Sequence, residues 1–194
     1  YKSKAAKPVK FDTQFPSFCF ALATGVGKTR LMGACIYYLW KTKGYRNFFI
    51  LSPNITIYDK LRAELNSAHP KYMFIGLADM PLPQVYDGDN YVRFNPSQML
   101  FGNPPNVFIF NISKILPTKK DKQAEESQSA NRSVEPFRFK FHQYQETLGA
   151  AFGALLQGMP DLVVLMDESH RYRGPAFLAA INNLRPALGL EFTA

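Results

Sequence analysis

The feature that most constrains the fold of this chain is an apolar segment that runs directly into a glycine-containing turn and then a helix. Residues 17–23, SFCFALA, are typical of a buried strand, and residues 29–43 are typical of a helix. Glycines in the turn between them let backbone N–H groups converge on a phosphate, and a helix N-terminus adds the positive end of its dipole. The segment therefore predicts a phosphate-binding turn at the carboxyl end of a strand.

The turn, ATGVGKT, follows the pattern of a Walker A motif. We expect the Lys28 ammonium to reach the β- and γ-phosphates of ATP, and the Thr29 hydroxyl to hold Mg²⁺. The complete pattern has Gly or Ala five residues before Gly27, where this chain has Leu22. The alternative is a Gly-Lys-Thr that only begins a helix. The expected nucleotide-binding residues are Thr24, Gly25, Val26, Gly27, Lys28 and Thr29.

A second apolar run, LVVLM, leads into Asp167 and Glu168. An isolated buried carboxylate is costly, so a cation is expected nearby. As a Walker B motif, Asp167 would complete the Mg²⁺ shell and Glu168 would polarise the water that attacks the γ-phosphate. The alternative is a solvated acidic turn. Because each motif requires the other, together they predict ATP binding and hydrolysis, with Lys28 and Glu168 as catalytic residues.

Short apolar runs alternate with amphipathic stretches along the chain, which is typical of a mainly parallel sheet flanked by helices on both faces. This predicts an α/β fold in a single domain over residues 1–194. Gly44 is expected to end the helix 29–43. The other expected strands are 47–53, 72–77, 107–112, 162–166 and 188–194, and the other expected helices are 58–66, about 139–157 and near 176–184. Loops are expected over 78–106, with a short strand near 91–94, and a polar loop insertion over 117–136.

Charge and composition limit the function classes. The formal net charge of +8 suits a polyanionic partner such as nucleic acid. Cys19 and Cys35 lie in apolar runs and are expected to be buried free thiols. No apolar run approaches the ~18 residues of a membrane helix, and the N-terminal residues lack an apolar signal core. We therefore expect a cytoplasmic protein without a membrane partner.

Several segments resemble a known family. ALATGVGKT, MDESH and EFTA resemble motifs I, II and III of superfamily-2 helicases and translocases, and Asp-Glu-Ser-His resembles the DEAH-type box. Within that group the chain resembles the restriction (Res) subunit of type III restriction enzymes and related DEAD/DEAH-box proteins. The segments that carry this resemblance are GYRNFFILSPNITI, NVFIFNISKI, PDLVVLMDESHRYRG and LGLEFTA. The resemblance implies a RecA-like P-loop domain that binds ATP and Mg²⁺ as the first motor domain of a DNA translocase or helicase.

The resemblance also implies residue roles. His170 would couple the nucleotide site to the rest of the motor, and Thr193 and Ala194 would begin the motif that links hydrolysis to DNA movement. Ser52, Pro53 and Asn54 fall where motif Ia contacts the nucleic-acid backbone. The alternatives are a locally bonded turn histidine, and a strand-to-helix turn in which Asn54 caps a helix.

Partners follow from the same resemblance. They are DNA contacted at its backbone, a second RecA-like domain of the same parent chain that supplies arginines to the γ-phosphate, and a DNA-methyltransferase (modification) subunit. We expect the chain to be a fragment of a longer protein and to hydrolyse ATP weakly, if at all, when isolated. The resemblance implies an endonuclease, but the residues contain no nuclease motif and leave a downstream nuclease domain open. Alternatives are an RNA helicase motor and a nucleotide-dependent switch or scaffold. A small-molecule kinase fits less well because no lid or acceptor site is evident.

Overall fold

The computed structural model describes residues 13–95, 103–112, 148–171 and 174–194. The expected polar insertion at 117–136 lies outside the described residues, as does the first part of the helix expected at about 139–157. Among the helices of the described part of the chain, none is both long and apolar enough to cross a bilayer.

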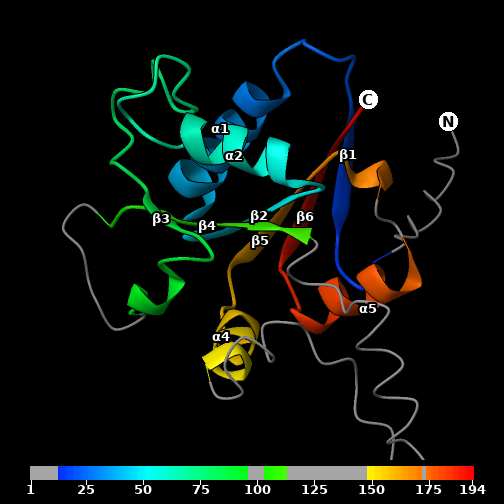
Figure 1. The fold of residues 1–194 in the computed structure, drawn as a ribbon. Coiled ribbons are helices and arrows are strands. Elements are labelled where there is room, and N and C mark those ends of the chain that lie inside the picture. Colours follow the sequence, from blue (N-terminus) through cyan, green and yellow to red (C-terminus); the bar gives the residue numbers. More distant parts are fainter. Residues whose placement is uncertain (1–12, 96–102, 113–147, 172–173) are drawn as a thin grey trace, which may run out of the picture.

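Six strands form one sheet in the order β1-β6-β5-β2-β4-β3 (Figure 1). Every pairing among these strands is parallel, so their carboxyl ends lie at one edge of the sheet. Residues at this edge can therefore meet although they are far apart in the sequence. The strands are β1 (Ser17–Ala21), β2 (Asn47–Ser52), β3 (Gln84–Tyr86), β4 (Asn106–Asn111), β5 (Leu162–Asp167) and β6 (Leu188–Thr193).

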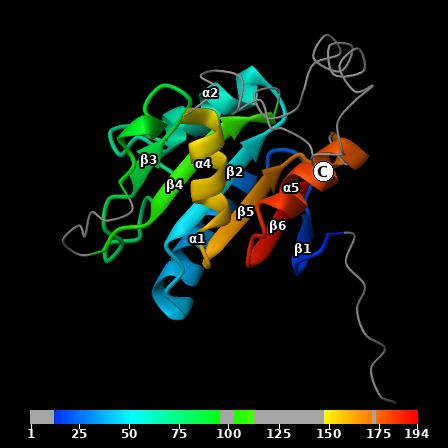
Figure 2. The ribbon, with the colours of Figure 1, turned by 90° about the horizontal axis from the view of Figure 1, so that it is seen from below.

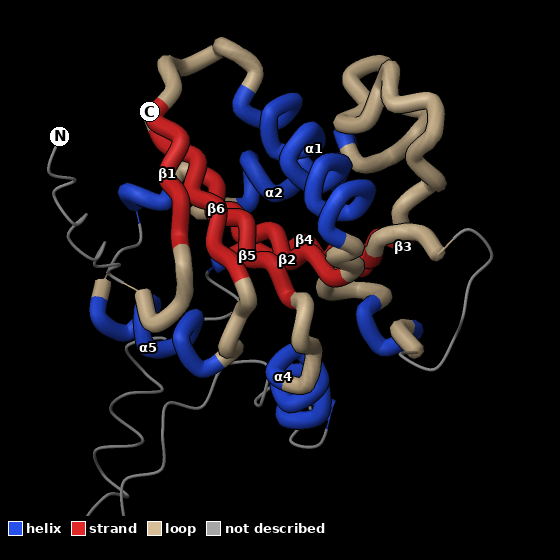
Figure 3. Tube along the Cα trace, turned by 180° about the vertical axis from the view of Figure 1, so that it is seen from behind, coloured by secondary structure: helices blue, strands red, loops and turns tan. Residues whose placement is uncertain are grey.

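Helices cover both faces of this sheet. The α-helices are α1 (Lys28–Tyr38), α2 (Ile55–Glu64), α4 (Leu148–Gln157) and α5 (Pro175–Asn183). The views from below and from behind show α1 and α2 on one face and α4 and α5 on the other (Figures 2 and 3). The predicted α/β class with helices on both faces is confirmed.

Two apolar layers hold the helices to the sheet. Phe48 and Ile50 of β2 belong to the layer under α1 and α2, with Met32 and Leu61. The intervening strand residues face the opposite layer, under α4 and α5, because alternate side chains point to opposite faces. All the strand residues Phe48, Phe49, Ile50 and Leu51 are fully buried. Burial on both faces explains why the central strands are continuous apolar runs in the sequence.

The prediction of a strand at 72–77 is wrong, because these residues form turns. Met73 and Phe74 are buried in the layer that contains α1 and α2, so their apolar character serves packing on a helix. The contact with α1 is close, since a Cβ on Gly33 would lie 2.6 Å from the Met73 carbonyl oxygen.

Other boundaries also differ from the predictions. The short strand expected near 91–94 is a 3₁₀-helix, η2 (Tyr91–Arg93), and the short strand lies instead at β3. After α1 the chain continues as a π-helix, η1 (Leu39–Lys43), which ends at Gly44 with φ of 72°. Cys19 is exposed on the edge strand β1 and Cys35 is half-buried, so neither thiol is fully buried as predicted.

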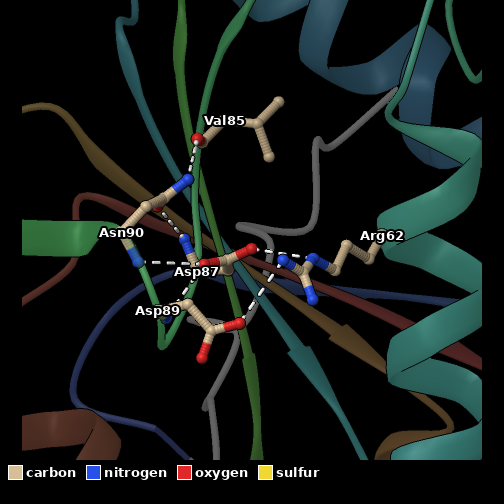
Figure 4. Close-up of polar contacts among 5 residues, drawn as sticks. All are labelled: Arg62, Val85, Asp87, Asp89 and Asn90. Atoms are coloured by element: carbon tan, nitrogen blue, oxygen red, sulfur yellow. Dashed lines mark hydrogen bonds and ion pairs between the residues drawn. The ribbon is translucent and has the colours of Figure 1, made fainter.

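A buried carboxylate anchors α2 to the loop that follows β3 (Figure 4). Asp87 is 3% exposed, and its Oδ2 lies 2.8 Å from Nε of Arg62 on α2. Its Oδ1 accepts hydrogen bonds from the backbone N–H groups of Asp89 and Asn90 at 2.9 and 3.1 Å. The carboxylate is thus paired and hydrogen-bonded, which is what a buried charge requires.

Candidate functional site

The turn after β1 is open to solvent. Residues 23–27 are exposed, while Lys28 and Thr29, the first residues of α1, are half-buried. Gly25 and Gly27 have φ of 83° and 96°, values that favour glycine over any residue with a side chain. In the part of the chain that the structure describes, no side chain caps the N-terminus of α1. The turn therefore presents a helix N-terminus to which an anion can bind.

Asp167 is the last residue of β5 and is 8% exposed. Burial raises the pKa of its carboxyl, and the adjacent Glu168 carboxylate raises it further. The Lys28 and Lys60 cations act in the opposite direction. A buried carboxylate with a raised pKa at an open edge is suited to receive a further cation.

Glu168 has φ of 51°, a left-handed conformation for a residue with a side chain. Such a conformation costs on the order of 1–3 kcal/mol and persists only where the surroundings impose it. Ser169 follows in the 3₁₀-helix η6 (Ser169–Arg171) and is 1% exposed. Its hydroxyl finds no hydrogen-bond partner among the residues that the structure describes, and an unsatisfied buried hydroxyl costs about 1–3 kcal/mol. Two adjacent residues of this turn are thus in an unfavourable state.

Lys28 and Glu168, 140 residues apart in sequence, are in direct contact. Lys28 Nζ lies 2.6 Å from Glu168 Oε1, and the two side chains are 12% and 14% exposed. The strand β6 lies between their two strands, and the register pairs Ala21 with Thr193 and Asp167 with Phe192. The phosphate-binding turn and the paired carboxylates therefore form one site.

His170 connects this site to the end of β6. Its Nδ1 lies 2.6 Å from the Thr193 hydroxyl oxygen and 3.5 Å from Glu168 Oε2. The Thr193 carbonyl accepts a hydrogen bond of 2.9 Å from the backbone N–H of Leu22, just before the turn. Ala194 follows and is exposed. The structure thus brings two of the predicted coupling residues, His170 and Thr193, into contact with each other, and it links them to Glu168 and to Leu22.

A comparison with known families identifies a family to which the chain is similar along its length. The family model described as "Type III restriction enzyme, res subunit" matches residues 1–194, the whole chain. The chain belongs to this family. No curated protein matches it. Membership in the Res family supports a RecA-like P-loop fold and a helicase-type ATPase motor domain, of a kind that uses ATP and Mg²⁺ and binds DNA.

The residues of this Res-family chain suit magnesium. Mg²⁺ prefers hard oxygen ligands and keeps waters and nucleotide oxygens in its shell. The Thr29 hydroxyl and the Asp167 carboxylate are ligands of that type. Within the described ranges, no group of three or more His, Cys, Asp or Glu side chains could hold a metal ion. A nucleotide-bound Mg²⁺ does not need such a group.

The segment Ser52–Asn54 differs in part from its predicted use. Ser52 is fully buried, so its hydroxyl is not available to a nucleic-acid phosphate. Asn54 caps α2, its side chain accepting from the Ile57 backbone N–H at 2.9 Å. Pro53 and Asn54 are half-buried, and their contact with nucleic acid stays a prediction.

Sequence reasoning missed two features of this Res-family site. Lys60, on α2, acts electrostatically on Asp167, and the orphan hydroxyl of Ser169 lies between the two predicted residues Glu168 and His170. Neither has a sequence signal, because both depend on how the chain packs around the end of β5.

Proposed function

We propose that the chain is the ATP-binding and ATP-hydrolysing first motor domain of a DNA translocase or helicase, the restriction subunit of a type III restriction-modification system. The contact between Lys28 and Glu168 carries this proposal. It supports a single site that has a phosphate-binding cation, a metal-binding carboxylate and a general base within reach of one another.

In the proposed mechanism Lys28 and the backbone of residues 24–29 hold the β- and γ-phosphates. Thr29 and Asp167 would hold Mg²⁺ together with the nucleotide, and the ion would supply positive charge against the charge that develops on the phosphates. Glu168 accepts a proton from the attacking water. The turn is exposed, which suits a second RecA-like domain that closes over the nucleotide and supplies arginines.

His170 and Thr193, with Ala194, carry the state of the nucleotide site to the end of β6 in this proposal. The hydrogen bond between the two side chains supports the role. DNA is the proposed polyanion, bound through its backbone at the loop that contains Pro53 and Asn54. A modification methyltransferase and an endonuclease domain complete the proposed restriction system.

The test measures binding of ATP and its hydrolysis with duplex DNA present. Lys28→Ala should weaken ATP binding at least tenfold, because the phosphate-binding cation is lost. Glu168→Gln should retain binding and lose hydrolysis by about 10² or more, the range for a general base. Lys43→Ala is the matched control, since it removes the same charge from an exposed position beyond the other end of α1. Full hydrolysis by Glu168→Gln would contradict the assigned base.

The nature of the nucleic acid is tested in the same assay. Stimulation of hydrolysis by duplex DNA but not by single-stranded RNA supports the proposal. The reverse order would make the chain an RNA motor. Hydrolysis without movement, measured as failure to displace a DNA triplex, would instead make it a switch or scaffold.

A further inference from the structure

The two edges of the sheet differ in how they are protected from further strand pairing. β3 forms one edge and is only three residues long. The Gln84 N–H faces β4 and bonds to the Pro105 carbonyl at 2.9 Å, so the backbone groups of the next residue, Val85, face outward. The Asn90 side chain donates a hydrogen bond of 3.3 Å to the Val85 carbonyl (Figure 4). This edge is therefore short and covered.

The opposite edge of the sheet is β1, whose five residues, SFCFA, include no charge and no proline (Figure 2). The Pro16 carbonyl and the Leu22 N–H bond to β6. Because backbone groups alternate in direction along a strand, those of Ser17, Cys19 and Ala21 face outward. In the described part of the chain, no strand pairs with this side of β1. An uncharged edge of this kind is a template for pairing with another strand.

The apolar surface of β1 continues from this edge onto one face of the sheet. Phe20 belongs to the apolar layer that contains α1 and α2, and its ring stacks on Phe192 with 5.3 Å between the centroids. Phe18 points to the same face, because side chains alternate along a strand. It is nevertheless 56% exposed. A strand added beside β1 would cover Phe18 with its own side chains on this face.

The sequence of β1 is complementary to itself. SFCFA reads nearly the same in both directions, as a small residue, Phe, Cys, Phe and a small residue. If two copies pair antiparallel about Cys19, all five residues of each strand find a partner. Ser17 then lies opposite the partner's Ala21, and Phe18 lies opposite the partner's Phe20. The outward-facing backbone groups of the two strands meet, aromatic side chains oppose each other, and no like charges do.

We infer that β1 is a homodimer interface, at which two copies of this chain join their sheets by antiparallel pairing about a two-fold axis at Cys19. The contact is isologous, since the same strand serves on both sides. Both Phe18 side chains become covered, and the two open edges disappear together. Two five-residue strands form a small interface, so the dimer is weak and reversible. This interface does not depend on the proposed ATPase function.

The first test is sedimentation velocity of the chain in reducing buffer, over a concentration series that reaches about 500 µM because the interface is small. The wild-type chain should shift from monomer to dimer along the series. Phe18→Lys should weaken the dimer at least about tenfold, because it places a charge in the covered surface. Val92→Lys is the matched control, since Val92 is a similarly exposed apolar residue, at 58%, outside β1. A monomeric wild-type chain at the highest concentration, or equal dimerisation of both variants, would overturn the interface.

Ala21→Pro provides a second variant that decides the question if Phe18→Lys does not fold. Proline removes the Ala21 N–H, which faces outward, and leaves the hydrogen bonds between β1 and β6 in place. The circular dichroism spectrum should therefore stay that of the wild-type chain. The dimer should weaken at least about tenfold, because the pairing loses a hydrogen bond at each end of the interface. A folded Ala21→Pro chain that dimerises like the wild type would contradict strand pairing at β1.

The register is tested by cross-linking with a short bismaleimide under reducing conditions that keep both thiols free. Side chains directly opposite each other in an antiparallel pair have Cβ atoms about 4.5–5.5 Å apart, so the two exposed Cys19 thiols should be linked in the dimer. Cys19→Ser should dimerise without cross-linking, and Cys35→Ser should do both. A dimer that is linked through Cys35, or that is not linked through Cys19, would overturn the two-fold pairing.

Discussion

Asp167 joins two conflicting requirements in one residue. It ends a strand whose six residues are all buried, yet it carries the carboxylate that the proposed metal needs. Burial is the largest cause of its raised pKa, which means that the folded protein holds the protonated form more tightly than the unfolded chain does. Without ligand, the charged form of Asp167 therefore destabilises the fold.

This has a defined effect on stability against pH. Since the pKa of Asp167 in the folded protein is raised above its ordinary value, the wild-type chain loses stability as pH rises from the unfolded pKa through the folded pKa. Asp167→Asn, which cannot ionise, should be more stable than the wild-type chain at pH 7, and the difference should shrink as pH falls through the folded pKa to the unfolded pKa. Urea unfolding over a pH series measures it. A difference independent of pH would show that ionisation of Asp167 is not the cause.

Individual residues also show how much of the site could be predicted from the sequence. The contact between Lys28 and Glu168 could be predicted, because the glycine turn and the acidic strand end were both expected to bind one nucleotide and its metal ion. The left-handed backbone of Glu168 and the orphan hydroxyl of Ser169 could not. Both arise from the geometry of a turn only a few residues long, which no periodicity encodes.

At the scale of elements, α1 packs tightly against the turns formed by residues 72–77. Gly33 of α1 lies against the carbonyl of Met73, and the Arg30 guanidinium donates to the carbonyls of Tyr72 and Ile75 at 3.2 and 3.4 Å. These contacts fix the turns of 72–77 against the helix that begins with Lys28.

Gly33→Ala should therefore destabilise the fold, although alanine is the better helix former. The new Cβ would lie 2.6 Å from a backbone oxygen, and overpacking of this kind costs about 1–3 kcal/mol. Ala34→Ser, at the exposed position next in the helix, should cost no more than about 0.5 kcal/mol. Chemical denaturation compares the two. Equal stability of both variants would mean that the 72–77 segment moves freely away from α1.

The same region shows why an apolar run alone does not predict a strand. The apolar runs of β2, β4 and β5 were predicted as strands to within a residue or two, because burial on both faces leaves an unbroken apolar run. Residues 72–77 have a similar run, yet they form turns, and Met73 and Phe74 are buried in the apolar layer that contains α1 and α2. Three-residue β3 was missed, since so short a segment has no measurable alternation.

For the whole molecule, the formal net charge of +8 sets an expectation for nucleic-acid binding. If the chain contacts the DNA backbone, each phosphate that it neutralises releases counterions, and affinity falls with salt. We expect the affinity for duplex DNA to drop at least about tenfold between 50 and 200 mM salt. Fluorescence anisotropy with a labelled duplex measures this. An affinity that does not change over the range would argue against a backbone-bound DNA partner.

The position of β6 has a mechanical consequence. β6 is hydrogen-bonded on one side to the strand that leads into the nucleotide turn and on the other to the strand that ends in Asp167, so it cannot slide without breaking two ladders. The Thr193 side chain, which contacts the His170 ring, can rotate without breaking either ladder. In the proposed mechanism, a change at the nucleotide site should therefore leave the sheet in place and reach the end of β6 through the hydrogen bond between His170 and Thr193.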